Sequence, residues 1–107
     1  MSRALLVFVT TPDLEQAQQI AGTLVSEQLA ACVNIVGAIE SIYRWKGEVT
    51  RDNEALMIIK TTDERYAALE TRVKQLHSYE TPEVIAVSIE QGSPEYLDWL
   101  RESVQPA

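Results

Sequence analysis

Two continuous apolar runs in this chain predict strands at the centre of a sheet. Residues 4–9 and 55–59 are apolar almost without interruption and do not alternate with polar residues. Such runs are typical of strands covered on both faces, where neither side meets water. A third segment, residues 84–89, follows Pro82 and predicts a further strand, because proline ends the connection before it.

A longer segment, residues 31–45, is rich in β-branched residues and shows the alternation of a strand. Gly37 lies in its middle, where a bulge or bend is expected. Lys46 and Gly47 supply a turn, after which residues 48–50 lead back toward the apolar run at 55–59. The two segments therefore predict one long hairpin.

The first helix is predicted after Thr11, Pro12 and Asp13. These residues offer a cap, a proline suited to the first helical position and an acidic group that favours a helix N-terminus. Apolar residues then recur at the spacing of one helical face, which we expect to lie on the sheet. This face consists of Ala17, Ile20, Ala21, Leu24 and Val25.

The second helix is predicted from residue 61 or 62 to about residue 77. Thr61 and Glu64 have the spacing of a capping box at its start. Ser93 and Pro94 then predict the beginning of a short terminal helix. The apolar face of the second helix consists of Tyr66, Leu69, Val73 and Leu76.

The order of these elements is β-α-β-β-α-β, followed by the short helix. This order predicts an α+β, ferredoxin-like fold, with an antiparallel four-stranded sheet and two helices on one face. The length of 107 residues fits a single domain, residues 1–107. A strand rises about 3.3 Å per residue and a helix about 1.5 Å, so the hairpin must project beyond the helices.

The projecting hairpin would leave aromatic side chains in water. Ile39, Tyr43 and Trp45 share one face by the two-residue period of a strand. Burying each large apolar side chain contributes about 1.5–3 kcal/mol. We therefore expect this face to pack against another copy of the chain, with a platform for a ligand as the alternative.

The charge balance limits the partners of this protein. The chain has 16 acidic and 9 basic residues and a formal charge of −7, which makes nucleic acid and anionic membranes poor partners. Its single cysteine, Cys32, cannot form an intrachain disulfide. The apolar stretch near the N-terminus is too short for a signal peptide or a membrane span. We expect a cytoplasmic protein that contacts neither membranes nor nucleic acid.

The residues that several known functions of ferredoxin-like domains require are absent from this sequence. The strand at 55–59 has no stacking aromatic residue for RNA. The loop at 10–14 has neither the Cys-x-x-Cys pair of a soft-metal chaperone nor a glycine-rich phosphate loop with an arginine. His77 is the single histidine, and no base and nucleophile stand in a plausible register. We therefore expect a protein that is not an enzyme and uses no organic cofactor.

His77 is the best candidate for chemistry, because its charge changes near neutral pH. His77, Glu80 and Glu83 are close in sequence and form a mixed nitrogen and oxygen set that could hold a divalent cation. The alternative is structural: an imidazole in the last turn of a helix favours the helix dipole and bonds a free carbonyl.

Four further residues, at positions 32, 60, 96 and 99, also have to be interpreted. Lys60 could neutralise an anionic ligand or pair with Glu54 or Glu83. Cys32 is expected to be a small buried apolar residue. The remaining aromatic pair is expected to pack the terminal helix onto the open sheet or onto a neighbouring subunit. This pair consists of Tyr96 and Trp99.

The residues that carry a family resemblance are spread over nearly the whole chain. They are LAACVN at 29–34, SIYRWKG at 41–47, Lys60 with Thr61, and YETPE at 79–83. Residues 10–12 (TTP) and 96–99 (YLDW) add to them in the same order. With these segments the chain resembles CutA, the divalent-cation tolerance protein family.

The resemblance implies a stable homotrimer, similar in architecture to the PII signal proteins, whose hairpins wrap neighbouring subunits. It also implies a cytoplasmic role in tolerance of copper and other divalent metals. In some bacterial relatives copper is placed on a first-strand cysteine and two adjacent histidines. The corresponding positions here are Val9, Leu76 and His77, so one of the three ligands is present.

Two hypotheses follow from the residues and the resemblance together. The first is a non-enzymatic homotrimer that binds divalent cations, chiefly Cu(II), through His77 with Glu80 or Glu83. The second is a PII-like regulatory trimer that binds a small anionic ligand in clefts between subunits, where polar groups meet aromatic ones. The residues expected to line such a cleft are Tyr43, Trp45, Lys60, Tyr79 and Glu83.

Overall fold

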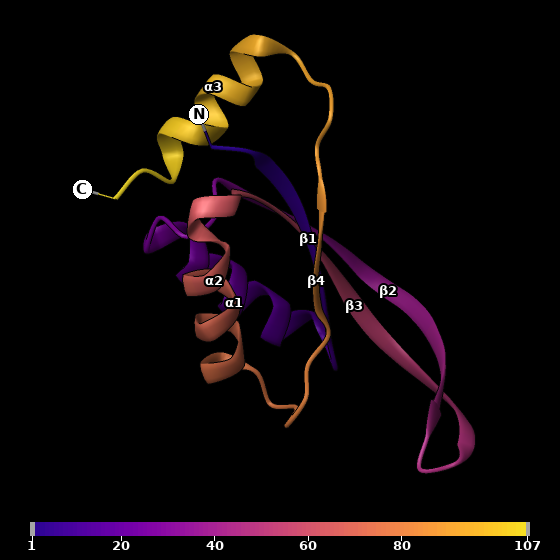
Figure 1. Ribbon diagram of the computed structural model, residues 1–107. Coiled ribbons are helices and arrows are strands. Elements are labelled where there is room, and N and C mark those ends of the chain that lie inside the picture. The colour runs from indigo at the N-terminus through magenta and orange to yellow at the C-terminus, as the bar shows by residue number, and fades with distance from the viewer. Residues whose placement is uncertain (1, 107) are drawn as a thin grey trace.

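The computed structural model describes residues 2–106 and contains seven elements (Figure 1). Their order confirms the predicted β-α-β-β-α-β arrangement with a terminal helix. The elements are β1 (Ala4–Thr11), α1 (Leu14–Ser26), β2 (Cys32–Trp45), β3 (Glu48–Thr62), α2 (Asp63–Leu76), β4 (Val84–Ser88) and α3 (Pro94–Ser103).

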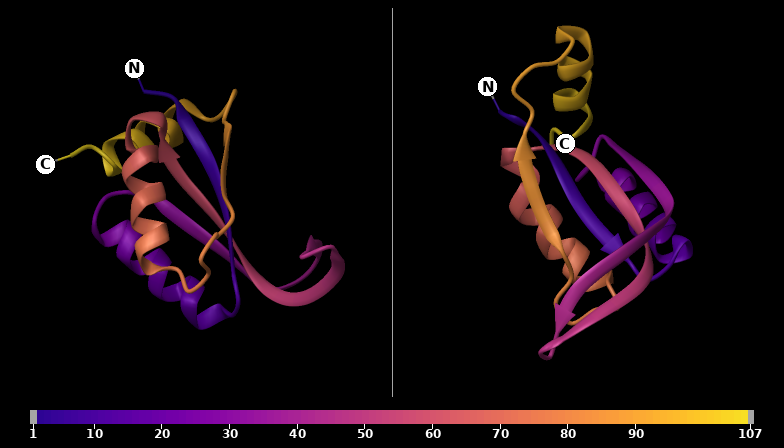
Figure 2. Two further views of the ribbon diagram at one scale, coloured as in Figure 1. Left: turned by 60° about the horizontal axis from the view of Figure 1, so that its bottom comes forward. Right: turned by 90° about the vertical axis from the view of Figure 1, so that its right-hand side faces the viewer.

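The four strands form one antiparallel sheet in the order β2-β3-β1-β4. Helices α1 and α2 lie side by side on one face of this sheet (Figures 1 and 2). The fold is therefore α+β, with helices and sheet in two layers, as predicted. Among the described residues, no helix is both long and apolar enough to cross a membrane.

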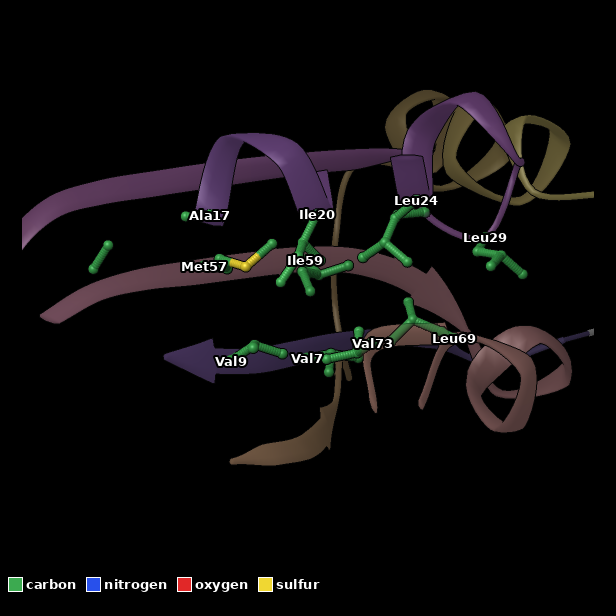
Figure 3. Close-up of a cluster of buried hydrophobic side chains, with 12 residues drawn as sticks. Val7, Val9, Ala17, Ile20, Leu24, Leu29, Met57, Ile59, Leu69 and Val73 are labelled. Carbon is green, nitrogen blue, oxygen red and sulfur yellow. The ribbon is translucent and has the colours of Figure 1, made fainter. Parts of the chain in front are cut away.

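The main core lies between the helices and the sheet (Figure 3). Strand periodicity explains its composition, because every second residue of β1 and β3 points to the helices. The predicted helical faces supply the other side, although Val25 lies outside the core and is exposed. The core includes Val7, Val9, Ala17, Ile20, Leu24, Met57, Ile59, Leu69 and Val73.

Within residues 2–106, the only helix on the other face of the sheet is α3, which packs at its edge on Ala4. Ile85 and Val87 of β4 pair with Phe8 and Leu6 of β1 on this face, and they are 55% and 50% exposed. The prediction that the central strands are covered on both faces therefore holds for one face of a single chain. No other described segment of the chain covers Ile85 and Val87.

The hairpin of β2 and β3 projects beyond the helices, as predicted (Figures 1 and 2). The register changes between Val36 and Ile39, where Gly37 predicted a bulge. Lys46 and Gly47 make the turn with φ angles of 50° and 81°, the left-handed values that a two-residue hairpin turn requires. The return strand β3 runs without interruption from Glu48 to Thr62, so residues 51–54 between the two predicted segments are also in the strand.

The predicted caps of α1 and α2 differ from the observed ones, whereas α3 begins after Ser93 with Pro94 in its first turn, as predicted. Thr11 belongs to β1, Pro12 precedes the cap, and the Asp13 side chain accepts a hydrogen bond from the Gln16 N–H at 2.8 Å. The predicted capping box at Thr61 is wrong, because β3 continues to residue 62. The Thr61 hydroxyl instead donates to the carbonyl of Leu29, at 2.7 Å. Thr11 and Thr61, which local motifs placed at helix starts, are therefore paired in strands instead.

The terminal helix α3 packs through aliphatic residues. Leu100 and Val104 are buried in a second small cluster with Ala4 and Ala31. The predicted aromatic pair does not pack α3 onto the sheet, because both rings remain partly in water. Tyr96 and Trp99 are 43% and 44% exposed. Their packing against a neighbouring subunit stays a prediction.

Two glycines, one in the hairpin turn and one in helix α1, predict opposite effects of substitution by alanine. Gly47→Ala should lower the free energy of unfolding by about 1 kcal/mol, because a Cβ is disfavoured at its positive φ. Gly22→Ala in α1 should raise it by about 0.5–1 kcal/mol, because no atom lies within 4 Å of the added Cβ. Urea unfolding followed by circular dichroism, at matched protein concentration, measures both. Shifts of the same sign would contradict the argument from φ.

Candidate functional site

A cleft of about 800 Å³ lies between the hairpin and the segment that joins α2 to β4. Acidic and aromatic side chains from these two parts of the chain line it. None of the described residues that line it is lysine or arginine. The acidic residues are Asp52, Glu54, Glu80 and Glu83, and the aromatic residues are Tyr43, Trp45 and Tyr79.

The hairpin contributes to this cleft through its cross-strand register. Ser41 pairs with Asp52, and Ile39 pairs with Glu54. Residues that are directly opposite share a face of the sheet, so these two carboxylates lie on the face that carries Tyr43. The shared face predicted for Ile39, Tyr43 and Trp45 therefore gains two acidic groups from the return strand.

Two tyrosine hydroxyls hold two of the carboxylates in place. Tyr43 donates to Asp52 within the hairpin, and Tyr79 donates to Glu54 at 2.8 Å. The second bond joins the segment after α2 to the hairpin across the cleft. The hydrogen bond to Asp52 raises the pKa of Tyr43. Partial burial and the bond to Glu54 raise the pKa of Tyr79 strongly.

His77 is buried behind the cleft and does not line it. Its Nε2 atom lies 2.7 Å from the carbonyl oxygen of Thr10, and the Tyr79 N–H donates to its Nδ1 at 3.0 Å. Because Nδ1 accepts, the ring proton lies on Nε2 and is donated to Thr10. The imidazole does bond a carbonyl, as the structural alternative predicted, but that carbonyl belongs to β1. His77 thereby fixes the start of the segment that carries Tyr79.

A second set of bonds anchors the same segment to α1. The Ser78 N–H donates to the side-chain oxygen of Gln16, at 3.0 Å, and the Gln16 amide nitrogen donates to the Ser78 hydroxyl at 3.0 Å. The wall of the cleft after α2 is therefore held from β1, from α1 and, through Tyr79, from the hairpin.

The three predicted metal ligands do not form a cluster within one chain. In residues 2–106, no group of three or more His, Cys, Asp or Glu side chains is arranged to hold a metal ion. Glu80 and Glu83 face the cleft, whereas His77 faces β1 and both of its ring nitrogens are engaged. Nearness in sequence brought these residues together in the prediction, but their side chains point to different sides of the backbone.

Lys60 does not line this cleft within the chain, and its place in a cleft between subunits stays a prediction. Its ammonium donates to the side-chain oxygen of Asn34 on the neighbouring strand β2, so neither Glu54 nor Glu83 is its partner. Cys32, directly opposite on β2, is a free thiol of intermediate burial. The other four predicted cleft residues, Tyr43, Trp45, Tyr79 and Glu83, do line it.

Asp52 and Glu54 were not predicted to line a cleft. The signal was present, because a two-residue turn at Lys46 and Gly47 fixes which residues face each other. Pairing outward from Trp45 with Glu48 places Asp52 opposite Ser41. Counting back from the turn would thus have placed both acidic residues on the aromatic face.

The chain is similar to known proteins over nearly its full length. The family described as CutA1 divalent ion tolerance protein matches residues 5–103. The divalent-cation tolerance protein CutA of Thermus thermophilus is 53% identical over 98 residues, covering 92% of this chain and 95% of that protein. Protein CutA 1, chloroplastic, of Oryza sativa is 48% identical over 102 residues, covering 95% of this chain and 58% of that protein.

Solved structures show the same similarity. That of the divalent cation tolerance protein (Cut A1) from Thermus thermophilus gives a TM-score of 0.94 at 51% sequence identity. It covers 95% of this chain and 99% of that one. The family description and the names of the Thermus thermophilus relatives describe tolerance of divalent cations and no catalysed reaction.

The bond between Tyr79 and Glu54 predicts a pH dependence. Because folding raises the pKa of Tyr79, this residue stabilises the fold fully below its unfolded pKa of about 10, and the stabilisation is lost as pH rises further. Tyr79→Phe should therefore lose less stability than the wild type above that pH. Denaturant unfolding at a series of alkaline pH values measures the difference.

Matched variants separate the bond from the burial. Glu54→Gln should lower the pKa of Tyr79, because it removes a negative charge next to the phenol, and absorbance titration of tyrosine measures this. Tyr96→Phe changes a tyrosine outside the cleft and should leave the alkaline loss of stability as in the wild type. An identical loss in Tyr79→Phe would show that Tyr79 does not cause the alkaline loss of stability.

Proposed function

The chain belongs to the CutA1 divalent ion tolerance protein family, and from this premise we propose that it binds divalent cations, chiefly Cu(II), as a non-enzymatic homotrimer in the cytoplasm. Binding of the cation by the protein is its proposed contribution to metal tolerance. The names of its relatives support tolerance as the role. The single cysteine, which permits no intrachain disulfide, is consistent with a reducing compartment.

The acidic cleft is the observation that carries this proposal. Four carboxylates line it and no basic side chain of the described lining residues offsets them. Carboxylate oxygens bind divalent cations in general. Cu(II) heads the affinity order of divalent first-row metals for a given site, which supports it as the tightest ligand.

A single chain offers an incomplete coordination shell. One or two carboxylates with water suffice for weak binding, and a second copy could contribute further ligands at a subunit boundary. His77 stays a predicted ligand. Binding through it requires the loss of its bond to Thr10 or to the Tyr79 N–H, and this lowers the expected affinity.

Exposed apolar surface supports the homotrimer. Ile85 and Val87 on the open sheet face, and Val49 on the hairpin, are all exposed in the single chain. Burying such side chains contributes about 1.5–3 kcal/mol each. A PII-like arrangement, in which hairpins wrap neighbouring subunits, would cover both surfaces.

The PII-like regulatory alternative has less support. A small anionic ligand needs positive charge, but Lys60 lies outside the cleft and bonds Asn34. A neighbouring copy would have to supply the missing cation. Thermal shift with nucleotides and other anions tests this alternative directly, since a ligand at 100 times its Kd adds about 2.7 kcal/mol.

Calorimetric titration of the metal-free protein with Cu(II) tests the main proposal. We expect saturable binding that weakens about tenfold or more in the double variant Glu80→Gln/Glu83→Gln, because two charged ligands are lost. Glu102→Gln removes one exposed carboxylate on α3 and should bind as the wild type does. Equal binding by all of these proteins would place the ion outside the cleft.

The His77→Ala variant then decides the role of the histidine. Weaker binding of Cu(II), with circular dichroism unchanged, would support His77 as a ligand. Unchanged binding would leave the cleft carboxylates as the site and assign His77 to structure alone.

The homotrimer makes a separate prediction for molecular mass in solution. Three chains of 12.0 kDa give about 36 kDa at micromolar concentration by light scattering. Val87→Asp should shift the protein toward monomer, because it buries a charge at the proposed interface. Val25→Asp, at an exposed residue of α1 on the helical layer, is the matched control and should stay trimeric. A wild-type monomer would overturn the proposed assembly.

A further inference from the structure

The carboxylates of the cleft are spread along it. Asp52 and Glu54 lie two residues apart on β3, a separation of about 6.6 Å along a strand. Glu80 and Glu83 lie on the opposite wall, in the segment after α2. In the part of the chain that the structure describes, no three of these groups are close enough together to hold one ion. Such an arrangement suits a ligand whose positive charges are themselves separated.

The aromatic residues that line the same cleft have faces that attract ammonium groups. Tyr43, Trp45 and Tyr79 line the same cleft as the carboxylates. A cation over an aromatic ring contributes about 0.5–1 kcal/mol at exposed sites. The chain itself shows the interaction, because the Lys46 ammonium lies 5.9 Å from the centre of the Trp45 ring. Aromatic rings also offer contact area for methylene groups.

We propose that this cleft binds a linear aliphatic polyamine, a chain of methylene groups that carries two or more protonated amines. The ammonium groups lie next to carboxylates of the two walls, and the methylene segments lie against the aromatic rings. A volume of about 800 Å³ is within the range of small-molecule sites. The proposal uses the same cleft as the metal proposal but does not depend on metal binding.

The hydrogen bonds around the cleft hold the polyamine site in shape before binding. Tyr43 donates to one oxygen of Asp52, and Tyr79 donates to one oxygen of Glu54. The second oxygen of each carboxylate can therefore accept a hydrogen bond from an ammonium group. His77 fixes the backbone of Tyr79 from behind. Less conformational entropy is therefore lost on binding than with free side chains.

Calorimetric titration with spermidine in physiological salt tests this inference. We expect one spermidine per chain, with binding weakened at least about tenfold in Glu54→Gln/Glu83→Gln, because one carboxylate is lost from each wall. Trp45→Leu should weaken it about two- to fivefold through loss of the ring. Glu102→Gln, outside the cleft, should bind as the wild type does.

A variant that is expected to bind spermidine more tightly provides a further control, because misfolding cannot explain a gain in affinity. Lys46→Asn removes the ammonium that now lies over Trp45 and keeps a turn residue that accepts the positive φ. It should bind spermidine about two- to fivefold more tightly. In a Trp99→Phe background, Trp45 is the single tryptophan, so its fluorescence should change as spermidine binds.

The outcomes separate this proposal from the metal proposal. Absence of saturable spermidine binding, or binding that is equal in the wild type and the double variant, overturns the polyamine site whatever Cu(II) does. Binding of 1-propylamine as tight as that of spermidine also overturns it, because separated charges would then not matter. Spermidine binding in a protein that fails to bind Cu(II) supports the polyamine site and overturns the metal proposal alone.

Discussion

The register of the β2–β3 hairpin is the constraint on which the rest of the site depends. A two-residue turn at Lys46 and Gly47 fixes the pairs on either side of it, so that Ser41 faces Asp52. A slip of one residue would move every side chain of one strand to the other face. The bulge near Gly37 lets the distal pairs keep this register while the proximal pairs serve the core. The acidic and aromatic face therefore originates in the geometry of one turn.

His77 links that distal face to the core. Its ring donates to Thr10 at the end of β1 and accepts from Tyr79, whose hydroxyl reaches Glu54 on the hairpin. Displacement of the ring would leave a buried carbonyl and an N–H without partners, which costs about 1–3 kcal/mol each. The histidine that looked most suited to chemistry in the sequence therefore acts as a positioning residue in the single chain.

Local patterns predicted the elements well because burial on one sheet face repeats along each strand and helix. They failed where one element competes with its neighbour: Thr61 looked like a capping residue, but pairing with β1 kept it in β3. Four of the five residues predicted for a cleft between subunits line the cleft within the chain, since period-two alternation places Tyr43 and Trp45 on one wall. The predicted pairing of Lys60 with Glu54 or Glu83 was wrong, because the sequence does not show that Asn34 lies beside it. The sequence likewise does not show that the Thr10 carbonyl lies beside His77, so it did not predict where the imidazole points.

The negative charge of the cleft both opposes folding, through repulsion between carboxylates, and makes the cleft prefer cations as ligands. Bringing Asp52, Glu54 and Glu83 around one cavity in a chain of net charge −7 sets like charges against each other. The Tyr79 bond to Glu54 holds the two walls together against that repulsion. A bound cation removes the repulsion in the folded state alone, because the unfolded chain does not bring the two walls together, and so stabilises the fold by linkage. The same repulsion disfavours anions. A site built in this way selects the sign of its ligand's charge first, and the spacing of the carboxylates then selects among cations.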